Sequence, residues 1–482
     1  MIPTRSVLRK SVAPLVIVML ASLATSARAQ SDALPRRGFF GAQIESVPES
    51  LHAKLDLPSG RGVLVKAVAV DGAARVAGVA ARDVILSVNG ADVNDPRAFV
   101  ALVREHRAGD RFRVTLLRDG KRLSKVIAVK PLPLERDPSF DILYRSVVVD
   151  GRRLRTIITK PKATGRHPAV LLIGGLGCYS LDGIGEGHAY GKILYALTRQ
   201  GYVTMRVEKS GMGDSEGAPC SSPQTDLRAE VGGFVAGLEA LKSYGFVDAS
   251  SVVVFGHSMG GIVAPLVVNR SPASGVIVAG TIGTSIVEHE LANLRRQLVL
   301  RGADYGDVDA IVRQKEACNH RLYVERQTPE QITTDAPECT KLPIQPAAPY
   351  TYMQQAAALS LAKAWQGVEV PVLVVYGGSD YRTSVDEHQY LANMINSQCP
   401  GRATFVQIAG MDHGFAQASS QRASLHRTSD STAQEVFQPR ILDEVQRWLK
   451  SLPKEPLAPS TGATRCRSTA GRSAVGAGRL RD

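Results

Sequence analysis

The sequence predicts an α/β protein, with a mostly parallel sheet that carries helices on both faces, preceded by a small β-rich domain. Three observations predict this. After about residue 142, short apolar runs of strand length alternate with amphipathic stretches of helix length, as in parallel sheets. Between residues 38 and 130, strand-like runs are joined by hairpin turns instead. The chain has 482 residues, 44% hydrophobic and 21% charged, which is ordinary globular composition and enough for more than one domain.

The first 29 residues predict a cleavable export signal. A basic stretch at residues 5–10 precedes an apolar run at residues 12–24, and Ala-Arg-Ala at 27–29 fits the small-x-small cleavage motif. The apolar run is shorter than the roughly 20 residues that a spanning helix needs. We therefore expect cleavage after Ala29 and a periplasmic or secreted mature chain without an integral membrane segment; an uncleaved anchor is the alternative.

The charge pattern argues against a nucleic-acid partner. The chain has 58 Lys and Arg against 45 Asp and Glu, a formal net charge of +13, but part of this excess lies in the signal and the tail. The remainder contains no dense basic run of the kind that a nucleic-acid footprint requires. The tail, residues 453–482, is rich in Pro, Arg and small residues without apolar periodicity, and we expect it to be disordered.

The six cysteines indicate disulfides rather than a metal site. No C-x-x-C pair occurs, so a structural zinc site is poorly supported, and we expect neither a metal nor another cofactor. Export makes disulfides chemically permissible. Cys318 and Cys339 are close enough in sequence to form a local bridge.

The β-rich domain at 38–130 begins with Gly38-Phe39-Phe40-Gly41 and contains "GVLVKAVAVDGAARVAGVAARDVILSVNG" and "VTLLRDGK". Its expected elements are strands at 63–70, 83–88, 112–117 and 122–129 and a helix at 96–105, with turns at Asn89-Gly90 and Asp119-Gly120. These motifs, in this order, resemble a bacterial PDZ domain of the kind attached to exported serine proteases.

The PDZ resemblance implies a peptide partner. PDZ domains bind a peptide C-terminus as an added strand, and loop N–H groups hold its carboxylate. By resemblance, that loop is Phe39, Phe40 and Gly41, and the groove lies beside the helix at 96–105. The alternative is a PDZ fold that packs on the enzyme and binds no ligand.

A proline-rich linker, residues 131–141, leads to a second domain at 142–452. Its expected strands are 169–173, 202–207, 252–255, 275–279, 372–376 and 403–408. Ligand sites in parallel sheets gather beyond the carboxyl ends of the strands. Reactive side chains are therefore expected at these ends.

The strand at 252–255 runs into Gly256-His257-Ser258-Met259-Gly260, and an apolar helix-like segment, 262–269, follows. Strand, G-x-S-x-G and helix together form a nucleophile elbow, in which glycines permit a sharp turn and the serine hydroxyl is exposed at a helix N-terminus. Ser258 is the expected nucleophile.

A serine nucleophile needs a base and an orienting acid. The strand at 372–376 ends in Gly377-Gly378-Ser379-Asp380, and the strand at 403–408 is followed by His413. We predict His413 as the base and Asp380 as the acid. His257 is a rival base and Asp412 a rival acid, although each is adjacent to another member of the site.

Acyl transfer also needs hydrogen-bond donors for the oxyanion. One is expected to be the N–H of Met259, directly after the nucleophile. The other is expected in the Gly174–Gly177 loop after the strand at 169–173, with Leu176 as the candidate. No Gly-Lys-Ser/Thr follows this glycine-rich loop, which argues against a phosphate site.

Together these motifs resemble the α/β-hydrolase family over residues 142–452, including its order of Ser, Asp and His. The stretch "TMRVEKSGMGDSEG", residues 204–217, resembles the family's strand and loop before the elbow, with Glu208 and Lys209 where many members have Asp and Arg. The family often has His-Gly in the oxyanion loop, whereas this chain has Gly174-Gly175. The resemblance places both loops at the same edge of the sheet, where Cys178 and Cys220 would meet and brace the oxyanion loop.

Residues 281–368 form an insertion between two expected strands, with helical periodicity at 286–300 and 308–326. In this fold such an insertion usually forms a cap over the pocket, and Cys318 and Cys339 would both lie in it.

The expected function is hydrolysis of a carboxylic ester or thioester, a small-molecule substrate, through an acyl-enzyme on Ser258. Two alternatives remain open: a serine peptidase of the prolyl-oligopeptidase-like type, and a catalytically inert PDZ-containing binding protein. The choice of acyl and leaving group depends on how the cap packs.

Overall fold

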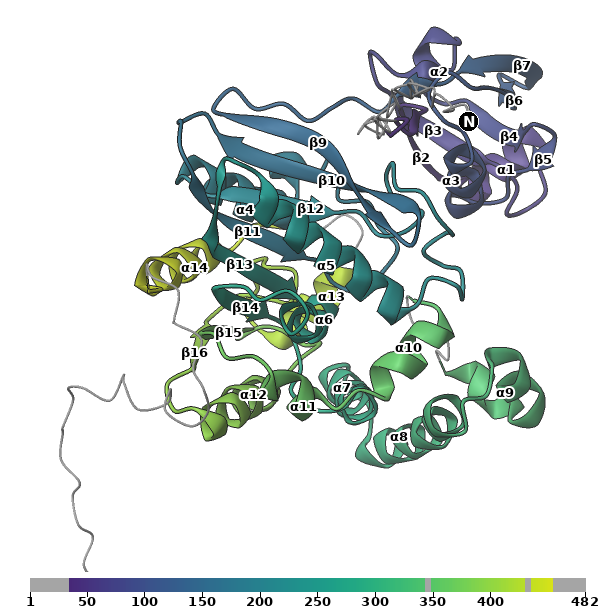
Figure 1. Ribbon diagram of the computed structural model, residues 1–482. Coiled ribbons are helices and arrows are strands. Elements are labelled where there is room, and N and C mark those ends of the chain that lie inside the picture. Colours follow the sequence, from purple (N-terminus) through teal and green to yellow (C-terminus); the bar gives the residue numbers. More distant parts are fainter. Residues whose placement is uncertain (1–33, 343–347, 430–434, 454–482) are drawn as a thin grey trace, which may run out of the picture. The chain divides into compact units, whose positions relative to one another are not determined.

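Residues 34–342, 348–429 and 435–453 are described by the computed structural model (Figure 1). The predicted signal at 1–29 and almost all of the predicted tail, from residue 454, lie outside the described residues. Within the described part, no helix is both long and apolar enough to cross a membrane.

The larger sheet has eight strands in the order β16-β15-β14-β13-β11-β12-β10-β9. Strands β11 to β16 pair in parallel, whereas β10 pairs antiparallel with both β12 and β9. The strands are β9 Phe140–Val149, β10 Arg152–Pro161, β11 His167–Ile173, β12 Val203–Val207, β13 Val247–His257, β14 Gly275–Ala279, β15 Val372–Gly377 and β16 Ala403–Ile408. All strands predicted for this domain are present.

The hairpin β9–β10 was missed by the strand pattern. Its turn, Asp150-Gly151, has φ of +50° and +74°, a geometry that Asp-Gly pairs favour in hairpins. Strand β9 begins at Phe140, inside the segment predicted as linker, because Phe140 is buried against the sheet's neighbouring helix while the prolines before it are not. The end predicted for the linker, residue 141, is therefore wrong by two residues.

Helices cover both faces of this sheet, as predicted. Helices α4 (Ala189–Arg199) and α14 (Arg440–Ser451) pack on one face, and α5 (Leu227–Ser243), α6 (Met259–Val268) and α12 (Val385–Gln398) pack on the other. Successive strand residues serve opposite faces: in β11, Val170 and Leu172 face α4, whereas Leu171 and Ile173 face α5 and α6. Two-sided burial explains why the strands are continuously apolar.

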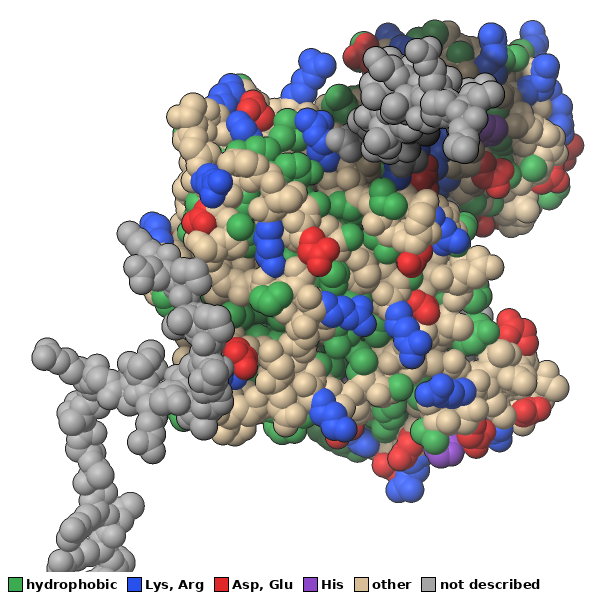
Figure 2. Space-filling model, in the orientation of Figure 1, with side chains coloured by type: hydrophobic (Ala, Val, Ile, Leu, Met, Phe, Trp, Pro, Cys, Tyr) green, Lys and Arg blue, Asp and Glu red, His purple; other side chains and the backbone are tan. Residues whose placement is uncertain are grey.

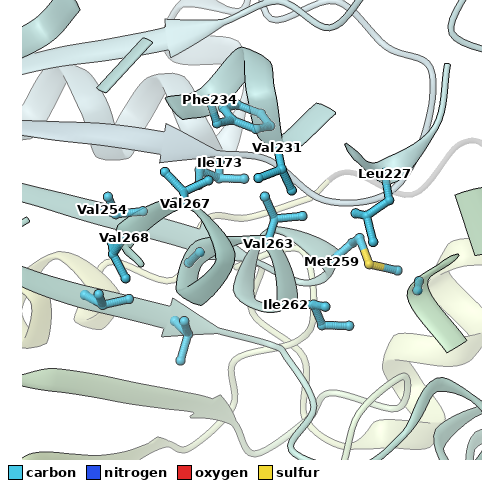
Figure 3. Packing of buried hydrophobic residues seen from close by; sticks show 14 of the residues in the cluster. Ile173, Leu227, Val231, Phe234, Val254, Met259, Ile262, Val263, Val267 and Val268 are labelled. Carbon is cyan, nitrogen blue, oxygen red and sulfur yellow. The ribbon is translucent and has the colours of Figure 1, made fainter. Parts of the chain in front are cut away.

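Helix α6, which follows the predicted nucleophile, is buried against the sheet and against the neighbouring helix α5 (Figure 3). Its side chains Val263 and Val267 lie beside Ile173 of β11 and Phe234 of α5. Each is fully or almost fully buried, which is worth about 1.5–3 kcal/mol per side chain relative to exposure. Packing therefore fixes the start of α6, and with it the position of Ser258.

The insertion at 281–368 is helical, as predicted, and forms the cap. Its helices are α7 Ile286–Leu300, α8 Tyr305–Asn319, a π-helical turn His320–Val324, α9 Pro329–Asp335, a 3₁₀ turn Pro337–Lys341, α10 Tyr350–Ala357 and α11 Leu361–Gln366. Helix α8 starts three residues before the predicted bound because the Asp304 side chain caps it. The predicted bridge between Cys318 and Cys339 is present.

The N-terminal region forms its own six-stranded sheet, ordered β2-β3-β4-β6-β7 with β5 beside β4. Its strands are β2 Ala42–Ser46, β3 Val63–Val68, β4 Val84–Val88, β5 Ala91–Asp92, β6 Arg111–Arg118 and β7 Lys121–Ala128, and its helices are α1 Glu49–Leu55, α2 Ala73–Val76 and α3 Pro96–Arg104. A short ladder also pairs β1 (Gly38–Phe39) with β8 (Lys130–Pro131), so Pro131 closes this region rather than opening a linker. Its core includes Phe40 and Phe99.

Figure 2 shows basic and acidic side chains interspersed over the face that it draws. The sequence likewise contains no dense run of basic residues outside the predicted signal and tail.

The crossing of β13 and α6 gives a stability prediction. A side chain at Gly256 would place Cβ 2.3 Å from the carbonyl oxygen of Gly260, a main-chain atom that cannot move aside. Gly256→Ala is expected to lower the free energy of unfolding by about 2–3 kcal/mol, measured by thermal or urea unfolding. Gly245→Ala is the matched control, because an added Cβ there meets nothing within 4 Å. Equal stability of the two variants would contradict the prediction.

Candidate active site

The predicted catalytic residues lie beyond the carboxyl ends of three parallel strands. Ser258 follows β13, Asp380 follows β15 and His413 follows β16. Because β13, β14, β15 and β16 are consecutive neighbours in the sheet, their ends form one edge. The structure brings together three residues that are far apart along the chain.

Ser258 lies in a strained turn between β13 and α6. Its backbone has φ +56° and ψ −121°, a region that residues with side chains rarely adopt. The Ser258 N–H donates to the carbonyl of Ala279 on β14 at 2.9 Å, which holds the turn against the sheet. Gly260 allows the helix to pass the oxyanion loop, since a Cβ there would lie 2.1 Å from the carbonyl oxygen of Ile173.

Ser258, His413 and Asp380 form a continuous hydrogen-bonded relay. His413 Nε2 lies 3.1 Å from Ser258 Oγ, and His413 Nδ1 lies 2.8 Å from Asp380 Oδ2. Because the ionised carboxylate only accepts, Nδ1 carries the proton and Nε2 accepts from the serine hydroxyl. This tautomer is the one that a general base next to a serine requires.

Asp380 is fully buried and held in its ionised form. Burial alone would raise its pKa, but the His413 ring and hydrogen bonds from Thr383 outweigh this and lower the pKa well below its usual range. Thr383 donates through its hydroxyl at 2.5 Å and its N–H at 3.1 Å, and Arg382 N–H donates at 2.7 Å. Thr383 was not predicted from the sequence, although a hydroxyl three residues after an expected acid is a recognisable signal.

Asp412, the rival acid, has another set of partners. Its Oδ1 accepts from the N–H groups of Gly414 and Ala416 at 3.0 and 2.8 Å, and its Oδ2 accepts from Ser424 Oγ and from Arg427. Asp412 thus shapes the tight loop that presents His413, while Asp380 contacts the imidazole.

His257, the rival base, faces away from the nucleophile hydroxyl. Its Nε2 lies 2.8 Å from the carbonyl oxygen of His413, which can only accept, so Nε2 carries the proton. Its Nδ1 then accepts from the Tyr190 hydroxyl at 2.6 Å. Burial and the neighbouring His413 ring lower the pKa of His257 to about 3, so the ring is neutral near pH 7. Tyr190 was not anticipated from the sequence.

The two predicted oxyanion donors belong to segments that border the same cavity. Met259 is the first residue of α6, where the backbone N–H has no partner within its own helix. Leu176 follows Gly175, and a Cβ added to Gly175 would lie 3.3 Å from Ser258 Cβ. Gly175, Leu176, Ser258 and Met259 all line one cavity.

The predicted disulfide between Cys178 and Cys220 is present. It joins the oxyanion loop to the loop after β12. Gly177, between Leu176 and Cys178, has φ +127°, which favours glycine at that position.

The cavity above the relay measures about 640 Å³. Helix α7 of the cap contributes Ile286, His289, Glu290 and Asn293 to its wall, and α10 contributes Met353. The volume lies in the range typical of small-ligand pockets. The insertion at 281–368 therefore contributes to the wall of this cavity.

The residues predicted for the PDZ carboxylate loop precede β2, an edge strand of its sheet. The N–H groups of Phe40 and Gly41 have no partner among the described residues, whereas their carbonyls accept from Ala74 and Ala69 at 2.8 Å. The Phe40 ring is buried against Phe99, with centroids 5.1 Å apart. The Phe40 ring is therefore part of the core, and its main-chain N–H is the group left without a partner among the described residues.

The fold and the hydrogen-bonded relay of Ser258, His413 and Asp380 are those of the serine hydrolase class. Comparison of the chain with known protein families specifies the family. Residues 38–129 match the PDZ domain family, and residues 178–417 match the family described as serine aminopeptidase, S33. The chain is an α/β-hydrolase with an N-terminal PDZ domain.

Two curated proteins illustrate the two parts. Esterase EstD of Thermotoga maritima is 25% identical over 323 residues, which cover 66% of this chain and 70% of EstD. A probable periplasmic serine endoprotease, DegP-like, of Brucella suis is 33% identical over 103 residues, 21% of this chain and 20% of that protein. The chain thus spans only about a fifth of the DegP-like protein. Among solved structures, Est1E from Butyrivibrio proteoclasticus covers 64% of this chain and 98% of its own, with 14% identity and a TM-score of 0.40.

Neutral His257 predicts a pH dependence of stability. Its pKa is about 3 in the folded state, below the ordinary value of 6.5, so the unfolded chain binds an extra proton between these pH values. The contribution of neutral His257 to the free energy of unfolding is therefore complete above pH 6.5 and is lost as the pH falls toward 3. Between pH 7.5 and pH 5, the free energy of unfolding should fall by up to about 2 kcal/mol less in His257→Gln than in the parent protein.

The measurement is urea unfolding at both pH values. His320→Gln is the control for removal of a histidine, because the His320 side chain is 58% exposed on the surface of the insertion. A pH dependence in His257→Gln equal to that of the parent protein would refute the assignment.

Proposed function

We propose that this enzyme hydrolyses a carboxylic ester or thioester through an acyl-enzyme, with Ser258 as nucleophile, His413 as base and Asp380 as orienting acid. The observation that carries the proposal is the relay with 3.1 and 2.8 Å contacts on the wall of a cavity of about 640 Å³. The similarity to an esterase over 66% of the chain supports the ester bond as the target.

In acylation, Ser258 Oγ forms a bond to the acyl carbon while its proton moves to His413 Nε2. The carbonyl oxygen becomes an oxyanion, which the N–H groups of Met259 and Leu176 are proposed to hold. Collapse of this intermediate breaks the bond to the leaving alcohol or thiol, which takes the proton from His413. Asp380 keeps the ring in its orientation and stabilises the imidazolium.

In deacylation, His413 takes a proton from a water molecule whose oxygen attacks the acyl carbon. The second oxyanion uses the same donors. Its collapse breaks the bond to Ser258 Oγ, which recovers a proton from His413, and the carboxylic acid leaves. The buried, ionised Asp380 serves both halves of the cycle without changing its own protonation state.

A peptidase is the second candidate, favoured by the match of residues 178–417 to a family described as serine aminopeptidase. Both activities would use the same relay, since they differ in the leaving group. The PDZ domain, residues 38–130, is proposed to bind a peptide C-terminus through the N–H groups of Phe40 and Gly41, with the ligand added beside β2. We assign the hydrolase domain to residues 140–452 and its cap to 281–368.

Export to the periplasm or beyond is proposed from the signal-like N-terminus. The two disulfides and the similarity of the PDZ domain to proteins named periplasmic support it.

The nucleophile assignment predicts the behaviour of two variants. Ser258→Ala should abolish labelling by a fluorophosphonate and lower kcat/KM for short-chain acyl esters by at least about 10⁴-fold. Asp380→Asn should lower kcat by about 10³- to 10⁴-fold, because the amide favours the wrong imidazole tautomer. Hydrolysis of p-nitrophenyl esters, acyl thioesters and aminoacyl amides on one enzyme preparation separates esterase from peptidase. Labelling that persists in Ser258→Ala would disprove the assignment.

The PDZ proposal is tested on the full chain carrying Ser258→Ala, so that no peptide is cleaved. Fluorescence anisotropy with peptides that end in an apolar residue should show binding. The same peptides with an amidated C-terminus should bind at least about tenfold more weakly, because the loop N–H groups lose a charge-assisted bond worth about 1.5–3 kcal/mol. Equal binding of acid and amide would exclude the proposed loop.

A further inference from the structure

We propose that Lys209 is a positioning residue for the oxyanion hole: it holds and polarises the peptide bond between Gly175 and Leu176, so that the Leu176 N–H is presented to the oxyanion. This inference deepens, and rests on, the acyl-transfer mechanism proposed above. It concerns a buried charged side chain to which that mechanism gives no part.

The peptide in question lies directly beside the nucleophile. A Cβ added to Gly175 would lie 3.3 Å from Ser258 Cβ and 3.7 Å from His257 Nδ1. Gly175 and Leu176 also line the cavity that contains Ser258. The orientation of this one peptide therefore decides whether a second N–H faces the reacting carbonyl.

The Gly175 carbonyl oxygen accepts a hydrogen bond from the ammonium group of Lys209. Lys209 Nζ donates to this oxygen at 3.1 Å, and the Tyr179 hydroxyl donates to it at 3.2 Å. Lys209 Nζ also pairs with Glu230 Oε2 at 3.1 Å, with only 8% and 6% of the two side chains exposed. Glu230 in turn accepts from the Tyr352 hydroxyl at 3.2 Å.

The other side of Gly175 is fixed as well. Its N–H donates to the Tyr190 hydroxyl at 3.1 Å, and that hydroxyl donates to His257 Nδ1. The Gly175 N–H is thus already engaged and is not the oxyanion donor. The Leu176 N–H has no partner among the described residues, and it is the next N–H along the loop.

Peptide geometry links the lysine to that N–H. The chain has no cis peptide bond among its described residues, so the Gly175 C=O and the Leu176 N–H point in opposite directions across one rigid plane. Holding the carbonyl toward Lys209 turns the N–H away from Lys209. A charge-assisted bond to the carbonyl also draws electrons from the amide nitrogen, which makes its N–H a stronger donor in a site of low dielectric.

An ion pair between Lys209 and Glu230 that served only the structure would add little to the stability of the fold. Burying Lys209 and Glu230 costs solvation, and an apolar pair of similar volume is often equally stable. A role at the oxyanion would explain why the ammonium bonds to the one carbonyl that shares a peptide with the predicted donor.

The experiment measures the rate constant for phosphonylation of Ser258 by a fluorophosphonate, together with kcat and KM for a short-chain ester. In Lys209→Gln, we expect phosphonylation and kcat to fall about 10- to 100-fold with KM within twofold, somewhat less than the loss of a whole oxyanion donor. Tyr179→Phe removes the neutral donor to the same carbonyl and should cost less than Lys209→Gln. Lys209→Arg should recover part of the rate.

Lys242→Gln is the matched control. Lys242 Nζ also donates to a main-chain carbonyl, that of Pro272, and to Ser271 Oγ at 3.0 Å, but it is not part of the cavity wall. It should leave the phosphonylation rate unchanged. Lys209→Gln leaves Glu230 unpaired and could fail to fold. In that case the double variant Lys209→Met/Glu230→Gln, which removes both charges, takes its place. The midpoint of thermal unfolding checks that each variant is folded.

A folded variant without the Lys209 ammonium that is phosphonylated at the parent rate would overturn the inference. A loss that appears mainly in KM, or one that Lys242→Gln reproduces, would overturn it too. Failure of the ester proposal is a separate outcome. A parent enzyme that reacts with the fluorophosphonate but hydrolyses no ester would refute the proposed substrate. The effect of Lys209 substitutions on phosphonylation would still decide the inference about Lys209.

Discussion

The close crossing of strand β13 and helix α6 is the constraint on which the rest of the site depends. The chain turns from strand into helix at a single residue, Ser258, whose backbone is strained at φ +56°. Glycines at 256 and 260 make this possible, because any side chain there would meet main-chain atoms at 2.3 and 2.1 Å. The apolar face of α6, buried against α5 and the sheet, holds the turn in that state. Strain at the nucleophile is thus balanced by packing.

Buried polar groups, together with core side chains such as Phe415, fix the loops around Ser258. Thr383 holds Asp380, Asp412 shapes the loop of His413, and the His257–Tyr190 pair joins that loop to Gly175. Each of these bonds is shielded from water, where an unpaired group would cost more than it does at the surface. The reacting atoms are therefore placed by a connected network that extends to the oxyanion loop.

The combination of a PDZ domain with an α/β-hydrolase joins two binding modes in one chain. Edge strands of PDZ domains pair with extended main chain, and β2 is such an edge strand, whereas a cavity of about 640 Å³ has the size of small-molecule sites. The cap wall mixes Ile286 and Met353 with His289, Glu290 and Asn293.

The sequence by itself predicted the fold class, the parallel strands, the helical insertion, the local Cys318–Cys339 bridge and the three residues of the relay, whereas the Cys178–Cys220 pair was implied by the family resemblance. These follow from local signals: apolar runs of strand length, G-x-S-x-G between strand and helix, and polar residues directly after strands. It missed the β9–β10 hairpin, whose proline-rich approach hides the strand. Only the tertiary structure decided what the two rival residues contact. Asp412 binds the main chain of its own loop, and His257 contacts Tyr190 and the His413 carbonyl. Lys209 is far in sequence from Gly175, so no pattern indicated their contact. Contacts between loops from different strands depend on how the sheet twists and packs, and no local pattern encodes that distance.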